Sequence, residues 1–407
     1  MIEIIRKNWL WLNTTLGRRI IQDMKRDITK KLYDLILSRK GDFTRLARSI
    51  WLRPELGFEE KFACAEQKKL LSGLGFAVKS PFGGIKTAYK AVRGSGKPSF
   101  CFVAEYDALP GIGHGCGHNL ICAAAIAAGW AVATMLEKKK LAGTVIVMGT
   151  PGEEGKGGKV IMLKNNALKG VDAAMMTHPS WETMIDTAST AIRRLEVSFT
   201  GKAAHAAAHP DLGVNALDAV MLIFNGINAW RQHLPESSRV HGIIIKGGEM
   251  PNIIPDYSEC CFYLRSPDDA YLDKMERRFR DIVKGAALMT GAIPKIKNYN
   301  IPYKSRRPNA VLNTTYSEAA DILGLKPTAH LKPGRGSSDF GDFSHAVPGI
   351  HPYFGIAKKK IAGHSLDFTK AAGSDYGMKQ MLKAAAAMAS TGYFFITDKK
   401  FRKQVLG

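Results

Sequence analysis

Three short apolar runs, each followed at once by a loop rich in glycine and polar side chains, constrain the fold of this chain most strongly. The runs are FCFVA, TVIVM and AAMM, within residues 98–110, 143–158 and 171–180. Continuous apolar runs of this length are typical of strands that are covered on both faces. A strongly helical, apolar segment at residues 120–138 separates the first run from the second. Strands that alternate with helices predict an α/β unit, with a parallel or mixed sheet between helices.

The character of the sequence changes near residue 187. Alternating apolar and polar residues then predict strands with one exposed face, and two amphipathic stretches predict helices, at 189–206, 257–267, 214–234 and 271–291. Glycine-rich loops and buried strands return after about residue 300. Because 407 residues are too many for one hydrophobic core, we expect a small α+β domain inserted into a larger, discontinuous α/β domain. The expected segments are an N-terminal extension at 1–28, the large domain at 29–186 and 300–407, and the inserted domain at 187–299.

The net charge of +22 raises the hypothesis of a nucleic-acid-binding protein, because Lys and Arg that neutralise phosphates dominate such binding. The basic residues are nevertheless spread along the chain, with short concentrations near the N-terminus, at 357–363 and at 399–403. No zinc-finger spacing and no basic heptads accompany them. We therefore expect a basic surface without a specific nucleic-acid partner.

The six cysteines follow no regular spacing, which favours a reducing, cytoplasmic compartment. The chain has no run of 18 or more apolar residues, so the sequence predicts no membrane span. The first 21 residues mix Arg, Lys and Trp with short apolar runs and lack the long apolar centre of a signal peptide.

Residues suited to metal chemistry lie in the loops that follow the three buried strands, where sites form in open α/β sheets. Zinc accepts sulfur, nitrogen and oxygen ligands, and the loops offer all three. Neighbouring carboxylates point in different directions, so that one can bind a metal while the other stays free as a general base. The candidates in these loops, and in a further loop at 363–368, are Cys116, His118, Glu153, Glu154, His178 and His364.

The stretch GHGCGHN at 113–119 also allows a different hypothesis, in which Cys116 is a nucleophile activated by His114 or His118. Side chains this close in sequence rarely reach the geometry that such a pair needs. The hypothesis also leaves the adjacent Glu153 and Glu154 unexplained. The sequence therefore favours Cys116 as a metal ligand.

Several longer stretches together resemble the M20 family of metallopeptidases and amidohydrolases, in the branch of aminoacylases, aminobenzoyl-glutamate hydrolases and β-alanyl-lysine-type dipeptidases. They are AEYDALPGIGHGCGHN, TPGEEGKGGK, GKAAHAAAHPDLGVNALDA, PNIIPD, GSSDFGDFSHAVPGIHPYFGI and GHSLDF. The resemblance extends from near residue 53 to the C-terminal Ala-rich segment. It implies a large catalytic domain that binds two divalent metal ions, zinc or manganese, and an inserted domain that mediates homodimerisation.

The resemblance also implies a role for individual residues. Cys116, His118, Glu154, His178 and His364 would be metal ligands, Glu153 the general base, and Asp107 the carboxylate that orients a ligand. His205 would polarise the scissile carbonyl, often in the partner subunit's site. Asn252 would help hold the substrate, and the planar guanidinium of Arg265 would bind a terminal carboxylate. His114 is assigned to the loop rather than to the ligands.

We therefore expect a metal-dependent hydrolase that cleaves the amide bond of a small carboxylate-bearing molecule. A dipeptide, an N-acyl amino acid or an aminobenzoyl-glutamate type amide would fit. The alternative is a non-catalytic, metal-binding regulatory subunit of a heteromeric hydrolase, against which the presence of Glu153 argues.

Overall fold

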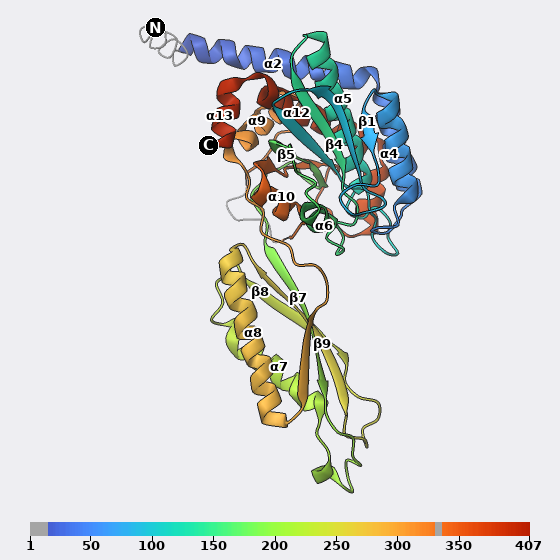
Figure 1. The fold of residues 1–407 in the computed structure, drawn as a ribbon, viewed down its shortest axis with the longest axis vertical. Helices are drawn as coiled ribbons and strands as arrows, with labels where there is room; N and C mark the ends of the chain where they lie inside the picture. The colour runs from blue at the N-terminus through green and yellow to red at the C-terminus, as the bar shows by residue number, and fades with distance from the viewer. Residues whose placement is uncertain (1–14, 330–335) are drawn as a thin grey trace.

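The structure, a computed structural model, describes residues 15–329 and 336–407, so the first half of the expected N-terminal extension lies outside the described residues. Figure 1 shows a large lobe and a small, elongated lobe. The large lobe is built on a six-stranded sheet with the order β1-β2-β4-β3-β5-β11. Its strands are β1 (Ala77–Lys79), β2 (Tyr89–Ser95), β3 (Ser99–Ala104), β4 (Gly143–Gly149), β5 (Ala173–Met175) and β11 (Gly349–Ile350).

The sheet is mixed and mainly parallel. Strands β4, β3, β5 and β11 run parallel to one another, whereas β1 and β2 add an antiparallel edge. Every residue of the central strand β3 is buried, because helices cover both faces of the sheet. Phe100 and Phe102 pack on one side, while Cys101 and Val103 pack on the other. The first side is covered by α5 (His118–Lys138) and α12 (Asp375–Thr397), and the second by α6 (Gly158–Lys164) and α10 (Phe340–Ala346).

Helix α5 has the length and apolarity of a membrane-crossing helix, although no uninterrupted run of 18 apolar residues occurs in it. Within the protein, 94% of its most apolar window is buried. It packs against β3, β4, α3 and α12. A helix that is apolar all round and enclosed on all sides is typical of the core of a large domain.

Helix α2 (Thr15–Ser38) runs through residue 28, the expected end of the N-terminal extension. Its buried residues Ile28, Leu32 and Ile36 recur every four positions, so they form one stripe along the helix. This stripe packs against α12 and α5, on the outside of the helical layer. The other helices of the large lobe are α3 (Lys40–Leu52), α4 (Lys61–Gly73), α9 (Ala310–Ile322), α11 (Leu366–Gly373) and α13 (Lys399–Leu406).

The small lobe holds an antiparallel sheet with the order β10-β7-β9-β8. Two helices lie along one face of this sheet (Figure 1). The elements are β7 (Ala191–Thr200), α7 (Ala216–Arg231), β8 (Arg239–Lys246), β9 (Tyr257–Ser266), α8 (Asp269–Thr290) and β10 (Ile293–Asn298). Asn215 and Asp268 cap the two helices with side-chain oxygens that accept backbone N–H bonds. The predicted fold class, an α/β lobe with a small inserted α+β unit, is confirmed.

One local difference affects the site. The sequence predicts a loop at residues 177–180, but His178–Ser180 forms strand β6, which pairs in parallel with β12 (Tyr353–Gly355). The partner strand lies about 170 residues further along the chain, so no local pattern could reveal the pairing. His178 is therefore held by a backbone ladder rather than by a free loop.

Candidate active site

Four neighbouring parallel strands end at the same edge of the large sheet, and each is followed by residues suited to chemistry. Asp107 lies three residues past β3, Glu153 follows β4, His178 follows β5, and His351 directly follows β11. The carboxyl ends of parallel strands meet at one edge, which is the usual place for a site in an α/β sheet. The sequence expectation for the first three loops thus becomes one continuous rim.

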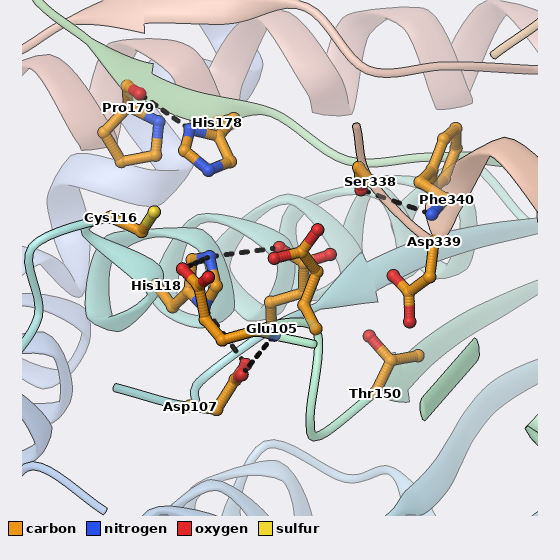
Figure 2. A network of polar contacts seen from close by, with 12 residues as sticks. Glu105, Asp107, Cys116, His118, Thr150, His178, Pro179, Ser338, Asp339 and Phe340 are labelled. Carbon is orange, nitrogen blue, oxygen red and sulfur yellow. Dashed lines mark hydrogen bonds and ion pairs between the residues drawn. The ribbon is translucent and has the colours of Figure 1, made fainter. Parts of the chain in front are cut away.

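A glycine explains why Cys116 and His118 are two residues apart. Gly117 has a φ of 73°, in the left-handed region, and precedes the first residue of α5, His118. A Cβ at this position would lie 2.7 Å from the side chain of Pro179, so a larger residue would clash as well as strain the backbone. The sharp turn places Cys116 before the helix and His118 on its first turn, both facing the rim (Figure 2).

Six side chains converge there in three overlapping groups, in each of which the donor atoms lie within 4.8 Å of one another. The Sγ atom of Cys116 lies 2.9 Å from Nε2 of His364. Oε1 of Glu154 lies 3.9 Å from Nε2 of His118 and 3.9 Å from Nε2 of His364. The groups are Cys116, His118 and His178; Cys116, Glu154 and His364; and His118, Glu153 and Glu154. These six are the residues proposed from the sequence.

The donor set fits a divalent cation on two grounds. Nε2 of His118 and Oε1 of Glu154 are buried and have no hydrogen-bond partner within the described part of the chain. Burial of polar atoms without a partner is costly, and a cation bound between them would satisfy both. The mixture of thiol, imidazole and carboxylate is also the set that zinc prefers.

Asp107 orients two of these groups. Its Oδ1 lies 3.1 Å from Nδ1 of His118, and its Oδ2 accepts the backbone N–H of Glu154 at 2.9 Å. A carboxylate on Nδ1 leaves Nε2 of the imidazole free for a metal ion. Asp107 therefore holds the ring of His118 and the backbone of Glu154 in register, in the place that the sequence predicts for an orienting carboxylate.

Glu153 is the neighbour that is free to act as a base. Burial raises its pKa well above the ordinary value, and the charges of Glu154, Glu105 and Asp339 raise it further. Its backbone carbonyl accepts a hydrogen bond from the hydroxyl of Tyr303 at 2.8 Å, which fixes the loop. A carboxylate whose pKa is moved toward neutrality is suited to accept and return a proton.

A buried ion triad behind the rim was not predicted from the sequence. Nζ of Lys159 donates to Oε1 of Glu105 at 2.5 Å and to Oδ1 of Asp339 at 2.7 Å, and all three side chains are fully buried. Oε2 of Glu105 has no hydrogen-bond partner among the described residues and lies 3.6 Å from Nε2 of His118. Glu105 follows β3 directly, which was a signal that the sequence offered.

A cavity of about 370 Å³ opens over the donor cluster. Cys116, Glu153, Glu154, His178 and His364 form one wall. The opposite wall includes residues of the small lobe and of the segments beside it: Arg194, Arg265, Tyr303, Ser337 and Trp181. Arg265 thus lies where the sequence predicts a substrate-binding arginine. His351 also lines the cavity, with its ring 5.4 Å from that of His178, and was not singled out from the sequence.

Three residues lie away from the donor cluster. His205 and Asn252 are exposed and share a turn of the small lobe, where the backbone N–H of Ala206 donates to the carbonyl of Asn252 at 3.0 Å. A strand rises about 3.3 Å per residue, so β7 alone carries the chain roughly 20 Å from Arg194 to Thr200, before His205. His114 is buried outside the three donor groups, as the sequence suggests, and burial together with His118 lowers its pKa to about 4.

Comparison with known proteins decides the family. The sequence model of peptidase family M20/M25/M40 matches residues 101–391. The chain belongs to this family. It is 38% identical over 362 residues to the Xaa-Arg dipeptidase of Mus musculus, covering 85% of this chain and 84% of the relative. It is 35% identical over 317 residues to one of the subunits of the p-aminobenzoyl-glutamate hydrolase of Escherichia coli (strain K12), covering 73% and 66%.

Solved structures agree with this M20 assignment at the level of the fold. A putative aminohydrolase from methicillin resistant Staphylococcus aureus superimposes with a TM-score of 0.76 at 21% identity, covering 91% of this chain and all of that one. The Bacillus subtilis YXEP protein, described as a dinuclear metal binding peptidase from the M20 family, gives 0.65 at 22% identity, covering 86% and 98%. As an M20 member, the protein is a hydrolase that acts on peptide and amide bonds.

Proposed function

We propose that this M20 hydrolase is a metal-dependent amidohydrolase or dipeptidase that cleaves a small, carboxylate-bearing substrate. One observation carries the proposal. The unpartnered atoms of His118 and Glu154 lie beside the buried Glu153, and the same cavity is lined by Arg265. A cation site, a base and a carboxylate-binding group thus face one space large enough for a dipeptide.

Two divalent ions held by Cys116, His118, Glu154, His178 and His364 would polarise the substrate carbonyl and make water acidic. Glu153 accepts the proton of the attacking water and returns it to the leaving nitrogen. The thiolate of Cys116 favours zinc, and the imidazole and carboxylate donors also suit manganese.

Arg265 would bind the terminal carboxylate of the substrate. Its Nη1 donates to Oγ of Ser337 at 3.0 Å and its Nε to Nε2 of His241 at 3.3 Å, so the guanidinium is held in place. A planar guanidinium held in this way can present its remaining N–H groups to a carboxylate as a fork.

We further propose a homodimer formed through the small lobe. The edge strand β8 exposes Ile243, Ile244 and Ile245, with 66%, 45% and 49% of their surface accessible. Three adjacent exposed isoleucines on a sheet edge are typical of a surface that pairs with another chain. His205 and Asn252, which do not line their own cavity, would then serve the site of the partner subunit.

A cytoplasmic location remains a proposal, supported by six cysteines that are all free thiols. No specific nucleic-acid partner and no membrane span are proposed, since α5, the one described helix apolar enough to span, is buried in the core.

The test is hydrolysis of a panel of dipeptides and N-acyl amino acids by the chain after loading with zinc or manganese. Glu153→Gln should lower kcat by about 10²–10⁴-fold, because it removes the proton acceptor, while the metal content stays at the wild-type level. Elemental analysis measures the metal. Activity that survives in Glu153→Gln would contradict the assigned base.

Two matched variants separate the roles. Glu154→Gln and Cys116→Ser should lower the bound metal together with the activity, because both remove ligands. If Cys116→Ser instead keeps its metal and loses activity, Cys116 acts as a nucleophile beside His364.

The second candidate function is a regulatory subunit, favoured by the similarity to the Escherichia coli relative, which is itself one component of a hydrolase with more than one kind of chain. It predicts that the metal-loaded chain alone cleaves none of the substrates. Binding of metal without hydrolysis across the panel would support this candidate.

A further inference from the structure

The cavity wall opposite the metal ligands carries a buried arginine that no carboxylate neutralises. Arg194, on β7, is only 8% exposed. Its Nη1 donates to the carbonyl of Ile301 at 2.9 Å, and its guanidinium lies 4.5 Å from the ring centre of Tyr303. Among the described residues, Arg194 forms no ion pair. A buried cation without a counter-ion is costly, so a partner is expected from outside the chain.

Arg306 shows what a neutralised arginine looks like in the same cavity. Its Nε and Nη2 donate to Oδ1 of Asp186 at 3.2 and 3.0 Å, its Nη2 also to the carbonyl of Ala188, and its Nη1 to the hydroxyl of Tyr353. Arg306 is thus satisfied within the protein. Arg194 has one such hydrogen bond in the described structure, which leaves most of its N–H donors for a ligand.

Arg265 lies close to Arg194. Both guanidinium groups flank the ring of Tyr263, with their Cζ atoms 5.6 Å (Arg194) and 6.0 Å (Arg265) from its centre. Burial and the charge of Arg194 lower the pKa of Arg265, as expected for two cations that share a partly dehydrated space. The described carboxylates that line the cavity are Glu153 and Glu154, which belong to the donor cluster.

We propose that this cavity selects substrates with two carboxylates, so that the amino acid released is glutamate or aspartate. Arg265 and Arg194 would each receive one carboxylate. The inference rests on the proposed hydrolase function and narrows its substrate class. A substrate whose C-terminal residue carries a cationic side chain would place that charge beside Arg194, where no free carboxylate is available to receive it.

The test compares three substrates that differ only in the C-terminal residue: Ala-Glu, Ala-Gln and Ala-Arg. Glutamine has the shape of glutamate without the charge. For the metal-loaded wild type, kcat/KM should be about 10- to 100-fold higher for Ala-Glu than for Ala-Gln, since a hydrogen bond to a charged group contributes this much. Ala-Arg should be the poorest of the three.

Arg194→Gln should bring the Glu-to-Gln ratio close to one while Ala-Gln is still cleaved, and Arg194→Lys should restore part of the ratio. The matched control is Arg193→Gln, because Arg193 is the next residue of β7 but faces outward and pairs with Asp273 and Glu276. This control should keep the wild-type ratio.

Three outcomes separate the two proposals. Cleavage of Ala-Arg at least as efficient as that of Ala-Glu overturns the inference and leaves the hydrolase function intact. An equal loss for Ala-Glu and Ala-Gln in Arg194→Gln also overturns it, because Arg194 would then only support Tyr303. If the wild type cleaves no amide, the proposed function fails, and calorimetric binding of glutamate against glutamine still decides the inference: equal affinity overturns it.

Discussion

Single carboxyl groups in this protein are tuned by what surrounds them. Glu60 precedes α4 and is fully buried behind the rim of the sheet. Its Oε1 accepts the backbone N–H of Gly152, and its Oε2 accepts the hydroxyl of Thr87, both at 2.9 Å. Burial, followed by the charge of Asp107, raises its pKa from 4.5 to about 7. Glu60 thus supports the loop that carries Glu153 at an electrostatic cost.

That cost predicts a dependence of stability on pH. Between about pH 4.5 and pH 7 the unfolded chain ionises Glu60 while the folded chain keeps it protonated, so the free energy of unfolding falls as the pH rises. The contribution is roughly 3 kcal/mol, at about 1.4 kcal/mol per pKa unit, and is constant above pH 7. Urea unfolding of chelator-treated protein at pH 5 and pH 7.5 measures it.

Glu60→Gln should remove this component of the fall, whereas its exposed neighbour Glu59, changed to Gln, should not. The same fall in Glu60→Gln as in the wild type would show that Glu60 ionises normally in the fold. Chelation is needed because metal affinity itself depends on pH.

At this scale, the sequence predicts the donor residues well and the arginine poorly. Cys116, Glu153 and His178 follow recognisable buried strands, so the common edge of the sheet brings them together. Arg193 and Arg194 look alike in the sequence, and alternation shows only that they point to opposite faces of β7. Which of the two meets the cavity depends on how the small lobe sits against Tyr303, and no local pattern contains that.

At the scale of elements, one lysine joins three segments that are far apart in the sequence. Lys159 lies in the first turn of α6, Glu105 follows β3, and Asp339 precedes α10. The backbone N–H of Lys159 also donates to Oδ2 of Asp339 at 2.9 Å, in addition to its two side-chain contacts. The triad therefore fixes the short helices on the second face of the sheet directly behind the metal-binding residues.

Lys159→Met should lower the free energy of unfolding by about 3–5 kcal/mol, because it leaves two buried carboxylates without a cation. Lys164→Met is the control, since Lys164 is exposed at the other end of the same helix. Urea unfolding without metal measures both. A loss below about 1 kcal/mol for Lys159→Met would mean that water enters and solvates Glu105 and Asp339.

Most elements of the fold were predictable because their patterns are local. The apolar runs of β3 and β4, the uniformly apolar α5 and the alternating β7 and β9 each carry their own signal. The pairing of β6 with β12 and the triad around Lys159 depend on contacts between distant segments, so sequence periodicity does not show them.

At the scale of the whole molecule, the site is divided between two lobes. The large lobe supplies the donor cluster and Glu153, while β7 and β9 of the small lobe supply Arg194 and Arg265. The loop with His205 lies at the end of β7 that points away from the large lobe (Figure 1). A homodimer formed through the small lobe would bring this loop to the cavity of the partner subunit, and this arrangement can be tested by complementation.

His205→Ala and Glu153→Gln should each be nearly inactive alone. If His205 acts in the partner's site, a mixed dimer contains one site with both residues intact. Random mixing of the two variants should then restore about a quarter of the wild-type activity, because half of the dimers are mixed and one of their two sites works. His209→Ala, in the same exposed segment, should stay active and serves as the control. Light scattering establishes the dimer, and no recovery on mixing exchangeable dimers would show that His205 does not act across the interface.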